Sequence, residues 1–488
     1  MKKTALLLLL CICLLLAGCT AQTAPQPIQP EPEPVPTEPE PAPPAAETAD
    51  TVASQEEQTQ ERPALPVPSA SMFSLTGREA VLYDAAVAQR YPRDDNDIVL
   101  PSLCVYGSFE AMLKVAVAEA DSLRAACAEF DRTLTVRMEK ISSEYAAVGA
   151  LAYRQAVAAH KAVSVDGKLL FLSKENFSNG CMATLDVTYP SIPLFLCLNP
   201  ELVKGMMRPL FAYARTAAWN LPYAPHDCGQ YPLCNGQVYG VNDGVVDEEH
   251  QMPVEECGNA ILVVAATVRA DGDRAFAEEN RDLLEKWADY LVAYGYNPGN
   301  QLCTDDFAGH LAHNCNLSLK AIVALGAYGQ LFGEKKYTEA AKKMAENWVR
   351  DAKRADGIGY NLTFDNPETW SLKYNIVWDR LLGLGLFDES VSREEQAVYL
   401  QKMRRYGVPL DSRADYTKID WLAWTTVMTD DTDYRDKVYR ATFRMVCESR
   451  DRIPVTDWYD AVDGRCVGFR ARSVLGGFYI NLLEEDFR

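Results

Sequence analysis

The chain has 488 residues and a formal net charge of −20, from 48 Lys and Arg against 68 Asp and Glu. This acidic balance argues against a partner with a phosphate backbone, so we expect no nucleic-acid partner. With 48% hydrophobic and 10% aromatic residues, most of the chain can bury a core, and the exceptions lie at the N-terminus.

Residues 1–19 have the pattern of a lipoprotein signal peptide. Two lysines precede a Leu-rich run that ends in Leu16-Ala17-Gly18-Cys19, which is a complete lipobox. The apolar run is shorter than a bilayer span. We therefore expect Cys19 to be lipidated, which would attach the protein to the membrane as a lipoprotein on its extracytoplasmic face. An ordinary cleaved signal peptide is the alternative.

Residues 20–70 are rich in proline and glutamate and contain the run QPEPEPVPTEPEPAPP. Hydrophobic residues are scarce there, so no core can form. We expect a disordered, semi-extended stalk.

From about residue 71 the pattern predicts one helix after another, of two alternating kinds. Residues 257–270 and 317–332 are apolar nearly all round, which indicates burial on every side. Residues 275–294 and 335–352 are amphipathic. The same alternation continues in amphipathic segments 394–406 and 433–448 and in mostly apolar segments 421–428 and 474–483. Further helices are expected at 107–130 and 132–160, and short strands at 168–173 and 183–189.

Alternating buried and amphipathic helices are what two concentric rings of helices require. We therefore predict an all-α fold, an (α/α)6 toroid over residues 166–488, with extra N-terminal helices in residues 71–165 and a few short strands. A solenoid of helix pairs is the rival, but the sequence has no fixed period. If the inner helices run the same way, their N-terminal loops meet at one mouth with several helix dipoles directed at it.

Cysteine usage gives little information on the compartment. The folded part holds eleven cysteines once Cys11, Cys13 and Cys19 are set aside from the total of 14, and no Cys-x-x-Cys spacing occurs. We expect most to be small buried residues, with Cys228 and Cys234 as a candidate disulfide.

About 330 residues in one register resemble the glutaminase A family of bacteria and fungi. The resemblance lies in the segments Phe171–Gly180, Asp186–Pro190, Asn199–Glu201, Tyr223–Asp227, Met252–Asn259, Cys303–Asn314, Trp378-Asp379, Pro409–Arg413, Asp420-Trp421, Asp457–Tyr459 and Gly468–Arg472. It implies a C-terminal domain like the six-hairpin glycosidases and hydrolysis of L-glutamine to L-glutamate and ammonia. Longer family members carry a large β-rich domain before the helical region. Here about a hundred residues separate the stalk from the matching part.

Carboxylates are the best candidates for the chemistry. The Ser-x-x-Lys and Gly-x-Ser-x-Gly patterns of serine hydrolases are absent from the sequence. Direct attack by water needs one protonated acid and one ionised base. We expect Asp306, or its neighbour Asp305, to be the acid, because this loop resembles the acid-bearing loop of six-hairpin glycosidases. Asp457 or Glu256 would be the base.

Two other interpretations of these loops stay open. Glu255 and Asp305 can simply cap inner helices through backbone N–H groups. A cysteine nucleophile, Cys303 or Cys315 beside a histidine, is possible, although small buried residues are the better interpretation of both.

Other polar and aromatic residues of the same loops are expected to bind substrate. Arg413 and Arg470 can hold a carboxylate in a bidentate fork, and Trp378 and Trp458, each beside an aspartate, can form a stacking platform. His160 is either structural or directed to the mouth, and Trp424 is expected in the core. The substrate-binding candidates are His226, Asp227, Glu255, His310, His313, Trp378, Asp379, Arg413, Trp458 and Arg470.

The histidines also permit a metal interpretation, with His310 and His313 three residues apart and Asp306 upstream. This spacing is not a recognised metal signature. We therefore expect no metal and no cofactor, and histidines that bind substrate or orient carboxylates.

Three functions remain. A glutaminase-type amidohydrolase acting on glutamine or a related amide comes first, and a glycoside hydrolase acting on an oligosaccharide comes second. A non-catalytic lipoprotein that binds a glycan or another solute is the third. An amino-acid substrate would need an Arg or Lys near the acids, whereas sugar cleavage would need opposed carboxyls and an aromatic floor.

Overall fold

The computed structural model describes residues 109–165, 168–231, 233–242, 245–451 and 454–488. The expected signal peptide, Cys19 and the stalk lie outside these residues. Across the described ranges, no helix combines the length and the apolarity that crossing a bilayer requires.

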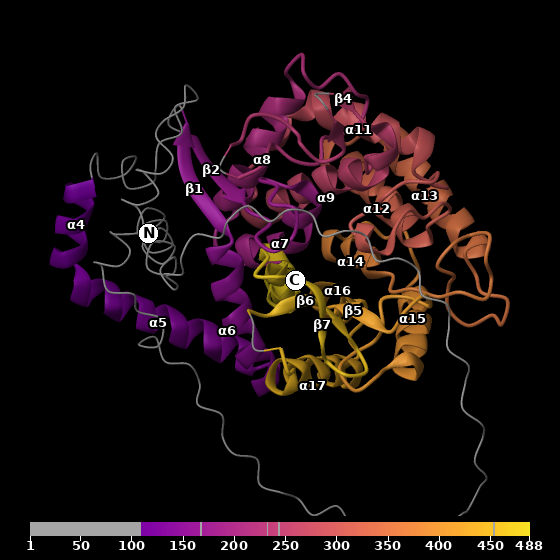
Figure 1. The fold of residues 1–488 in the computed structure, drawn as a ribbon. Helices are drawn as coiled ribbons and strands as arrows, with labels where there is room; N and C mark the ends of the chain where they lie inside the picture. The colour runs from indigo at the N-terminus through magenta and orange to yellow at the C-terminus, as the bar shows by residue number, and fades with distance from the viewer. Residues whose placement is uncertain (1–108, 166–167, 232, 243–244, 452–453) are drawn as a thin grey trace, which may run out of the picture.

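The described residues form an inner ring of six helical segments around a common axis (Figure 1). Each segment packs on the next, and the last packs on the first, so the ring is closed. In chain order the inner segments are α7 (Leu185–Leu198), α9 (Pro253–Asp271), α12 (Cys315–Phe332), η4 with α14 (Tyr374–Ile376 and Val377–Leu382), α16 (Ile419–Thr425), and η5 with α18 (Ser473–Tyr479 and Ile480–Phe487).

Outer helices alternate with the inner ones along the chain. They are α8 (Pro200–Ala214), α11 (Arg281–Tyr294, preceded by the short α10, Ala275–Glu279), α13 (Lys335–Asp351), α15 (Glu389–Lys402), α17 (Thr432–Glu448) and α6 (Ser143–Ala158). The helix α6 comes first in sequence but partners the last inner segment. The Tyr145 hydroxyl donates to the Phe478 carbonyl (2.9 Å), and the Tyr479 hydroxyl donates to the Gly149 carbonyl (3.0 Å). The predicted (α/α)6 fold is confirmed, but the predicted start of the toroid at residue 166 is wrong, because α6 (Ser143–Ala158) completes the outer ring.

The two kinds of helix differ in burial as their sequences predict. Helix α12 is buried on all sides from Cys315 to Gly329, whereas α13 buries only Tyr337, Ala341, Ala345 and Trp348 on one face. Local signals fix the ends of α12. The Asn314 side chain accepts from the backbone N–H groups of residues 316 and 317, and Gly333 ends the helix with φ of 70°.

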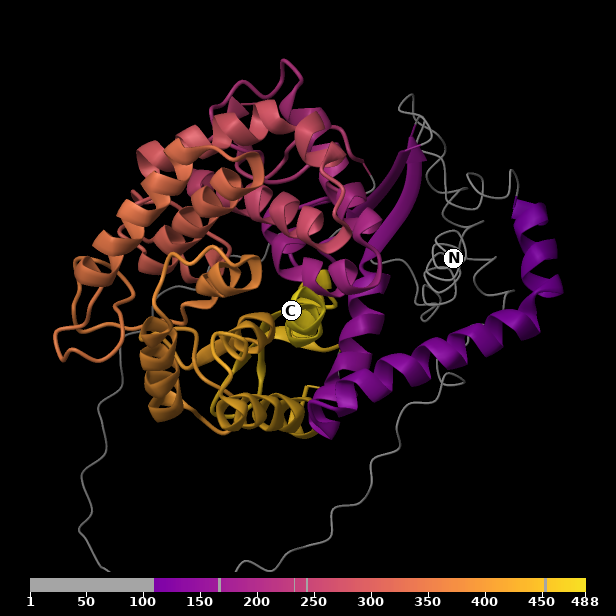
Figure 2. The ribbon, with the colours of Figure 1, turned by 180° about the vertical axis from the view of Figure 1, so that it is seen from behind.

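Among the described residues, two helices N-terminal to α6 lie outside the ring. Helix α4 (Phe109–Ala118) is followed by α5 (Ala120–Glu139), and both views show this arm (Figures 1 and 2). The C-terminal end of α5 reaches the toroid, where it packs on α6 and where Arg137 pairs with Glu485 and Asp486. The break expected near residue 131 is instead at residues 140–142, where Ser142 caps α6.

The described residues also form three small antiparallel sheets in the connections between helices. Strand β1 (His160–Val165) pairs with β2 (Lys168–Ser173) in the register His160↔Ser173, and β3 (Val241–Asn242) pairs with β4 (Val245–Val246). A third sheet has the order β5 (Tyr416–Lys418), β6 (Thr456–Asp460), β7 (Cys466–Arg470). The predicted strand at 168–173 is confirmed.

The strand predicted at 183–189 is wrong, because this segment opens α7. Valine, threonine and tyrosine followed by Pro190 and Pro193 favour a strand locally. Burial of nearly the whole helix inside the ring overrides that preference. The expected Cys228–Cys234 disulfide is also absent, and both residues are free thiols.

Candidate active site

Polar residues gather where the inner helices begin, as the sequence predicts. Asp186 lies in the first turn of α7, Glu255 and Glu256 in that of α9, Asn316 in that of α12, and Asp420 in that of α16. The loop before α12 joins the start of α7, since the Thr304 hydroxyl donates to the Asp186 carbonyl (3.4 Å). The positive ends of these helices therefore face a shared mouth rich in carboxylates.

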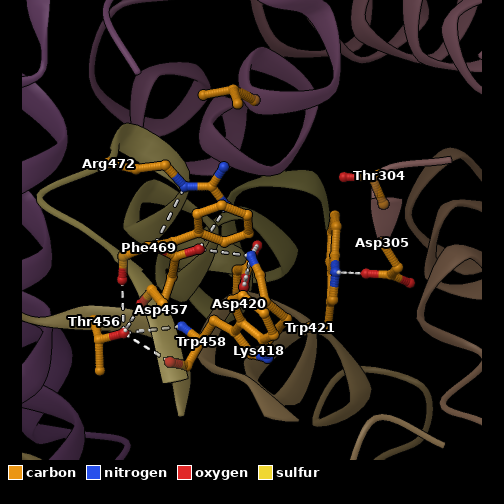
Figure 3. A network of polar contacts seen from close by, with 12 residues as sticks. Thr304, Asp305, Lys418, Asp420, Trp421, Thr456, Asp457, Trp458, Phe469 and Arg472 are labelled. Atoms are coloured by element: carbon orange, nitrogen blue, oxygen red, sulfur yellow. Dashed lines mark hydrogen bonds and ion pairs between the residues drawn. The ribbon is translucent and has the colours of Figure 1, made fainter. Parts of the chain in front are cut away.

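Asp305 is a buried carboxyl held by two aromatic donors. Its Oδ2 accepts from the Tyr374 hydroxyl (2.9 Å), and its Oδ1 accepts from the Trp421 indole N–H (3.2 Å; Figure 3). The rings of Tyr374 and Trp421 stack 4.0 Å apart, which fixes both donors. Burial raises the pKa of Asp305 to about 6, against the opposing charge of Lys418 and the Tyr374 hydrogen bond. This carboxyl is poised between its acid and base forms near neutral pH.

Asp306 is half-buried and points to a different neighbour. Its Oδ2 accepts from the Tyr239 hydroxyl (2.9 Å). The Tyr239 ring in turn stacks on the His226 imidazole at 4.0 Å. The two adjacent aspartates thus diverge. Asp305 contacts Tyr374 and Trp421, whereas Asp306 contacts Tyr239, which stacks on His226.

His226 lies between two carboxylates. Its Nδ1 is 3.0 Å from Asp227 Oδ2, and its Nε2 is 3.6 Å from Asp186 Oδ1. Asp227 also accepts from the backbone N–H groups of residues 229, 238 and 239, so it is fully engaged in holding this loop. Burial lowers the pKa of His226, but the Asp227 hydrogen bond and the Asp186 charge outweigh it and raise the pKa to about 10.

Asp186 and Glu256 share this buried space. Burial, opposed by His226, raises the pKa of Asp186 to about 7. Burial and the nearby Asp186 charge hold the pKa of Glu256 well above its usual range. Neither Asp186 Oδ1 nor Glu256 Oε1 has a hydrogen-bond partner within the described part of the chain.

Glu255, the neighbour of Glu256, is already paired. The Lys320 ammonium binds Glu255 Oε1 and donates to Asn259 Oδ1 (2.7 Å). Gly258 makes room for the lysine, because a Cβ there would lie 2.6 Å from Lys320 Cγ. Glu255 therefore carries a neutralised charge and is a positioning residue.

Asp457 lies in a closed ion-pair cluster with Lys418, Asp420 and Arg472 (Figure 3). Arg472 Nη2 is 2.6 Å and Lys418 Nζ 2.8 Å from Asp457 Oδ2, and Lys418 is 3.2 Å from Asp420. Burial alone would raise the pKa of Asp457, but Arg472 and Lys418 lower it to about 2. An acid that is fully ionised and paired with two buried cations is a poor base, so the base role expected for Asp457 is not supported by its surroundings.

A small pocket, partly open to solvent, lies on the Asp305 side of the mouth. Asp305, Asn316, Ser371 and Arg413 are among its lining residues. The fork of Arg413 is occupied, since its Nε and Nη2 bind Asp411 at 3.0 and 2.7 Å. The expectation that Arg413 offers a free fork for a substrate carboxylate is therefore wrong.

Trp458 and Arg470 lie near the rim on the third sheet. The half-buried Trp458 packs against Phe307 (ring centroids 4.3 Å apart), Tyr416 and Phe469. The Arg470 guanidinium lies 4.6 Å above the Phe177 ring. Both remain candidates for contact with substrate.

Five expected site residues or alternatives are held by structural contacts. Trp378 is fully buried against Tyr189 and Trp424, which confirms a core role for Trp424 and excludes a stacking platform at Trp378. Asp379 accepts from the N–H groups of residues 386 and 387 beyond the far end of α14. His310, His313 and His160 contact the Glu249 carbonyl, Asn297 and the Ala156 carbonyl, respectively. These histidines have structural partners and make no joint site with Asp306.

Other residues of the mouth were not singled out from the sequence as site residues. They are Glu175, Asp186, Tyr239, Lys320, Tyr374, Lys418 and Arg472. Asp186 and Arg472 fall inside segments that resemble the glutaminase A family, and each stands next to the start of an inner helix. These two features of the sequence could have identified both as site residues.

Comparison with known proteins identifies the toroid. Residues 142–482 match the family described as the glutaminase A six helical-hairpin domain. Glutaminase A of Aspergillus oryzae (strain ATCC 42149 / RIB 40) is 32% identical over 431 residues, covering 85% of this chain and 60% of that protein. A probable glutaminase of Arthroderma benhamiae is 27% identical over 439 residues, covering 70% of this chain and 50% of that protein. The chain thus spans only 50–60% of the length of these curated relatives.

Solved structures show weaker similarity. The GH63 mannosylglycerate hydrolase from Thermus thermophilus, in complex with Tris and D-glycerate, has a TM-score of 0.44 at 11% identity and covers 68% of this chain and 100% of that one. An uncharacterized conserved protein from the same organism has a TM-score of 0.41 at 12% identity, with 63% and 96% covered.

Proposed function

Because the chain belongs to the glutaminase A family, we propose that it is a hydrolase that releases ammonia from L-glutamine or a closely related amide. The observation that carries the chemistry is Asp305, a buried carboxyl with a pKa of about 6 beside a pocket open to solvent. Hydrolysis of an amide needs an acid to protonate the departing nitrogen, and a carboxyl with a raised pKa can supply that proton near neutral pH.

The environments of the acids support distinct roles. We assign Asp305 as the general acid, since Tyr374 and Trp421 hold both of its oxygens in place. The more accessible Asp306, held by Tyr239, is the carboxylate best placed to accept a proton from the attacking water. Water attack on the amide carbon and protonation of the leaving nitrogen then yield a carboxylate and ammonia.

Ammonia release from L-glutamine by the purified full-length protein tests this function. We expect turnover in the wild type and a loss of about 10²- to 10⁴-fold in kcat for Asp305→Asn, the range for removal of one acid–base group. Asp415→Asn is the matched control, because Asp415 is half-exposed and pairs with Arg404 on the surface. A folded wild type that releases no ammonia from glutamine or its simple amide analogues would refute the proposal.

A glycoside hydrolase is the second candidate, and one observation favours it. Trp458, Phe307, Tyr416 and Phe469 form an aromatic cluster beside the acids, as a sugar-binding floor requires. Reducing-sugar release from an oligosaccharide panel separates the two functions. Loss of that release in Trp458→Ala, with no ammonia from glutamine in the wild type, would establish the glycosidase.

We also propose that the protein is anchored to the membrane through a lipid on Cys19, on the extracytoplasmic face. The support is the lipobox sequence. Labelling cells with radioactive palmitate should mark the wild type and not Cys19→Ser. Unchanged labelling or unchanged membrane fractionation of the variant would contradict the anchor.

A further inference from the structure

The buried oxygens of Asp186 and Glu256 lack the partners that buried carboxylates need. A buried carboxylate oxygen without a donor is costly, and such groups in proteins nearly always have a partner. Here two of them belong to side chains at most one-tenth exposed, and Asp186 Oδ1 faces the His226 imidazole at 3.6 Å. One ligand atom from each of Asp186, His226 and Glu256 lies within 4.8 Å of the other two.

The separation of Asp186 and His226 does not fit a hydrogen bond. Their nearest atoms are 3.6 Å apart, beyond the usual range for N–H···O. In a tetrahedral site with metal–ligand bonds of about 2.0–2.1 Å, two ligand atoms are separated by about 3.3 Å. The observed distance is close to that edge length, so the two atoms are placed as ligands of a common cation rather than as donor and acceptor.

The residues that contact these three side chains resemble the groups that orient metal ligands in proteins. His226 presents Nε2 to the space while its Nδ1 is held by Asp227, which is the carboxylate–histidine arrangement that orients metal ligands. The Tyr239 ring stacks on the imidazole. On the opposite side, Asn259 donates to Glu256 Oε2 (3.0 Å), which leaves Oε1 free.

The nearby lysine and arginine side chains are bound to other carboxylates. Lys320 binds Glu255, and Arg472 binds Asp457 and approaches Glu175 at 3.5 Å. A second grouping, Cys181 with His226 and Asp227, is a poorer cage, because Asp227 already accepts three backbone N–H groups and the imidazole.

We propose that Asp186, His226 and Glu256 form a binding site for one divalent transition-metal ion of the zinc type. One nitrogen and two carboxylate oxygens suit such an ion. Three protein ligands leave a fourth coordination position open. The site is defined by these contacts alone and holds whether the substrate is an amide or a glycan.

Binding of Zn²⁺ to the full-length protein, after removal of metal with a chelator, tests this site. Calorimetric titration without substrate should show one tight equivalent, confirmed by metal analysis of the dialysed complex. Co²⁺ in place of Zn²⁺ should give the intense visible absorption of a four-coordinate ion. Glu256→Gln and Asp186→Asn should each weaken Zn²⁺ binding by more than about 100-fold, since each removes a ligand.

The matched control is His250→Gln. His250 lies 2.8 Å from Asp247 in an exposed pair and would account for adventitious surface binding. We expect it to leave the tight equivalent unchanged. If a ligand variant fails to fold, Asn259→Ala removes the donor that orients Glu256, together with the Asn259 contacts to Glu255 and Lys320, and a loss of about 10- to 100-fold is expected.

Absence of a tight equivalent in the folded wild type, or binding that survives both ligand variants, would overturn the site. Because no substrate is used, a protein that binds zinc but releases no ammonia would refute the proposed function and leave the metal site intact.

Discussion

Two buried carboxylate clusters share one mouth and differ in how their charge is balanced. In the first, Asp457 and Asp420 pair with Lys418 and Arg472, and both cations are at least nine-tenths buried. In the second, Asp186 and Glu256 share His226 and keep one oxygen each without a donor among the residues described. Equal burial therefore produces opposite outcomes: the pKa of Asp457 falls to about 2, whereas that of Asp186 rises to about 7.

The difference separates a supporting cluster from a reactive one. A carboxylate held by two buried cations cannot change its protonation state near neutral pH, so it can only fix the loops that carry it. A carboxyl without fixed compensation responds to a proton, a substrate or a cation. The following predictions test this division, from the largest expected effect to the smallest.

Arg472→Met should break the supporting cluster and destabilise the fold by about 3–5 kcal/mol, because it leaves Asp457 buried with a single cation. Denaturant unfolding of the purified protein measures this change. Arg470→Met is the control: that guanidinium lies on the Phe177 ring at the rim, and its loss should cost less than about 1 kcal/mol. Equal losses for both variants would show that burial of Arg472 does not matter.

Acid should remove the stabilising effect of Asp457. A carboxyl whose pKa is lowered by folding stabilises the protein above its unfolded value of 3.8, and this contribution is lost as pH falls through about 2. The wild type should lose on the order of 2 kcal/mol from this group between pH 4 and pH 2. Unfolding free energies of the wild type and Asp457→Asn across this range give the measurement; an identical pH slope in both proteins would contradict it.

Glu256→Gln should raise the free energy of unfolding, whereas changes in the supporting cluster should lower it. A carboxyl whose pKa is raised by folding costs stability above its unfolded value, so the metal-free variant should be more stable than the wild type at pH 7. The gain should vanish near pH 4. Thermal and denaturant unfolding in a chelator provide the test, and destabilisation at pH 7 would show that Glu256 is compensated after all.

Tyr374→Phe should shift the pH dependence of kcat/KM for ammonia release, with little effect on the stability of the protein. The Tyr374 hydroxyl donates to Asp305 and lowers its pKa, against the larger effect of burial. Without it the pKa of Asp305 rises, so the acid form persists to higher pH. The alkaline limb of kcat/KM for ammonia release, set by loss of that proton, should move upward by roughly half a pH unit. A downward or absent shift would argue against Asp305 as the acid.

The fold was accessible from the sequence because its periodicity is strong. Segments apolar on all sides, such as 317–332, can only be inner helices, and Lys335–Asp351 has one clear apolar face. Helix α7 was missed because two prolines and β-branched residues mask it, and only its position inside the ring favours the helix. The sheet β5–β6–β7 was missed because its strands are three to five residues long and come from distant segments.

The sequence predicts which loops form the site but not the role of each residue in them. Adjacent carboxylates identify a loop, but not which of them faces the substrate, and the sequence places Asp305 and Asp306 on equal terms. Their separation depends on Tyr374 and Tyr239, which lie about 70 residues away on either side. The pairing of Asp457 with Arg472, or of Arg413 with Asp411, likewise becomes visible only when the loops are in place.

The joint between α6 and η5 has a consequence for how the protein reaches its native state. Contacts such as Tyr145 with Phe478 join residues 333 positions apart, so the chain must close a very long loop to complete the ring. Before the last fifteen residues take their place, α7 and α16 lack an apolar neighbour between them. Partly synthesised chains therefore expose an apolar seam, and productive folding depends on protection of that seam until synthesis is finished.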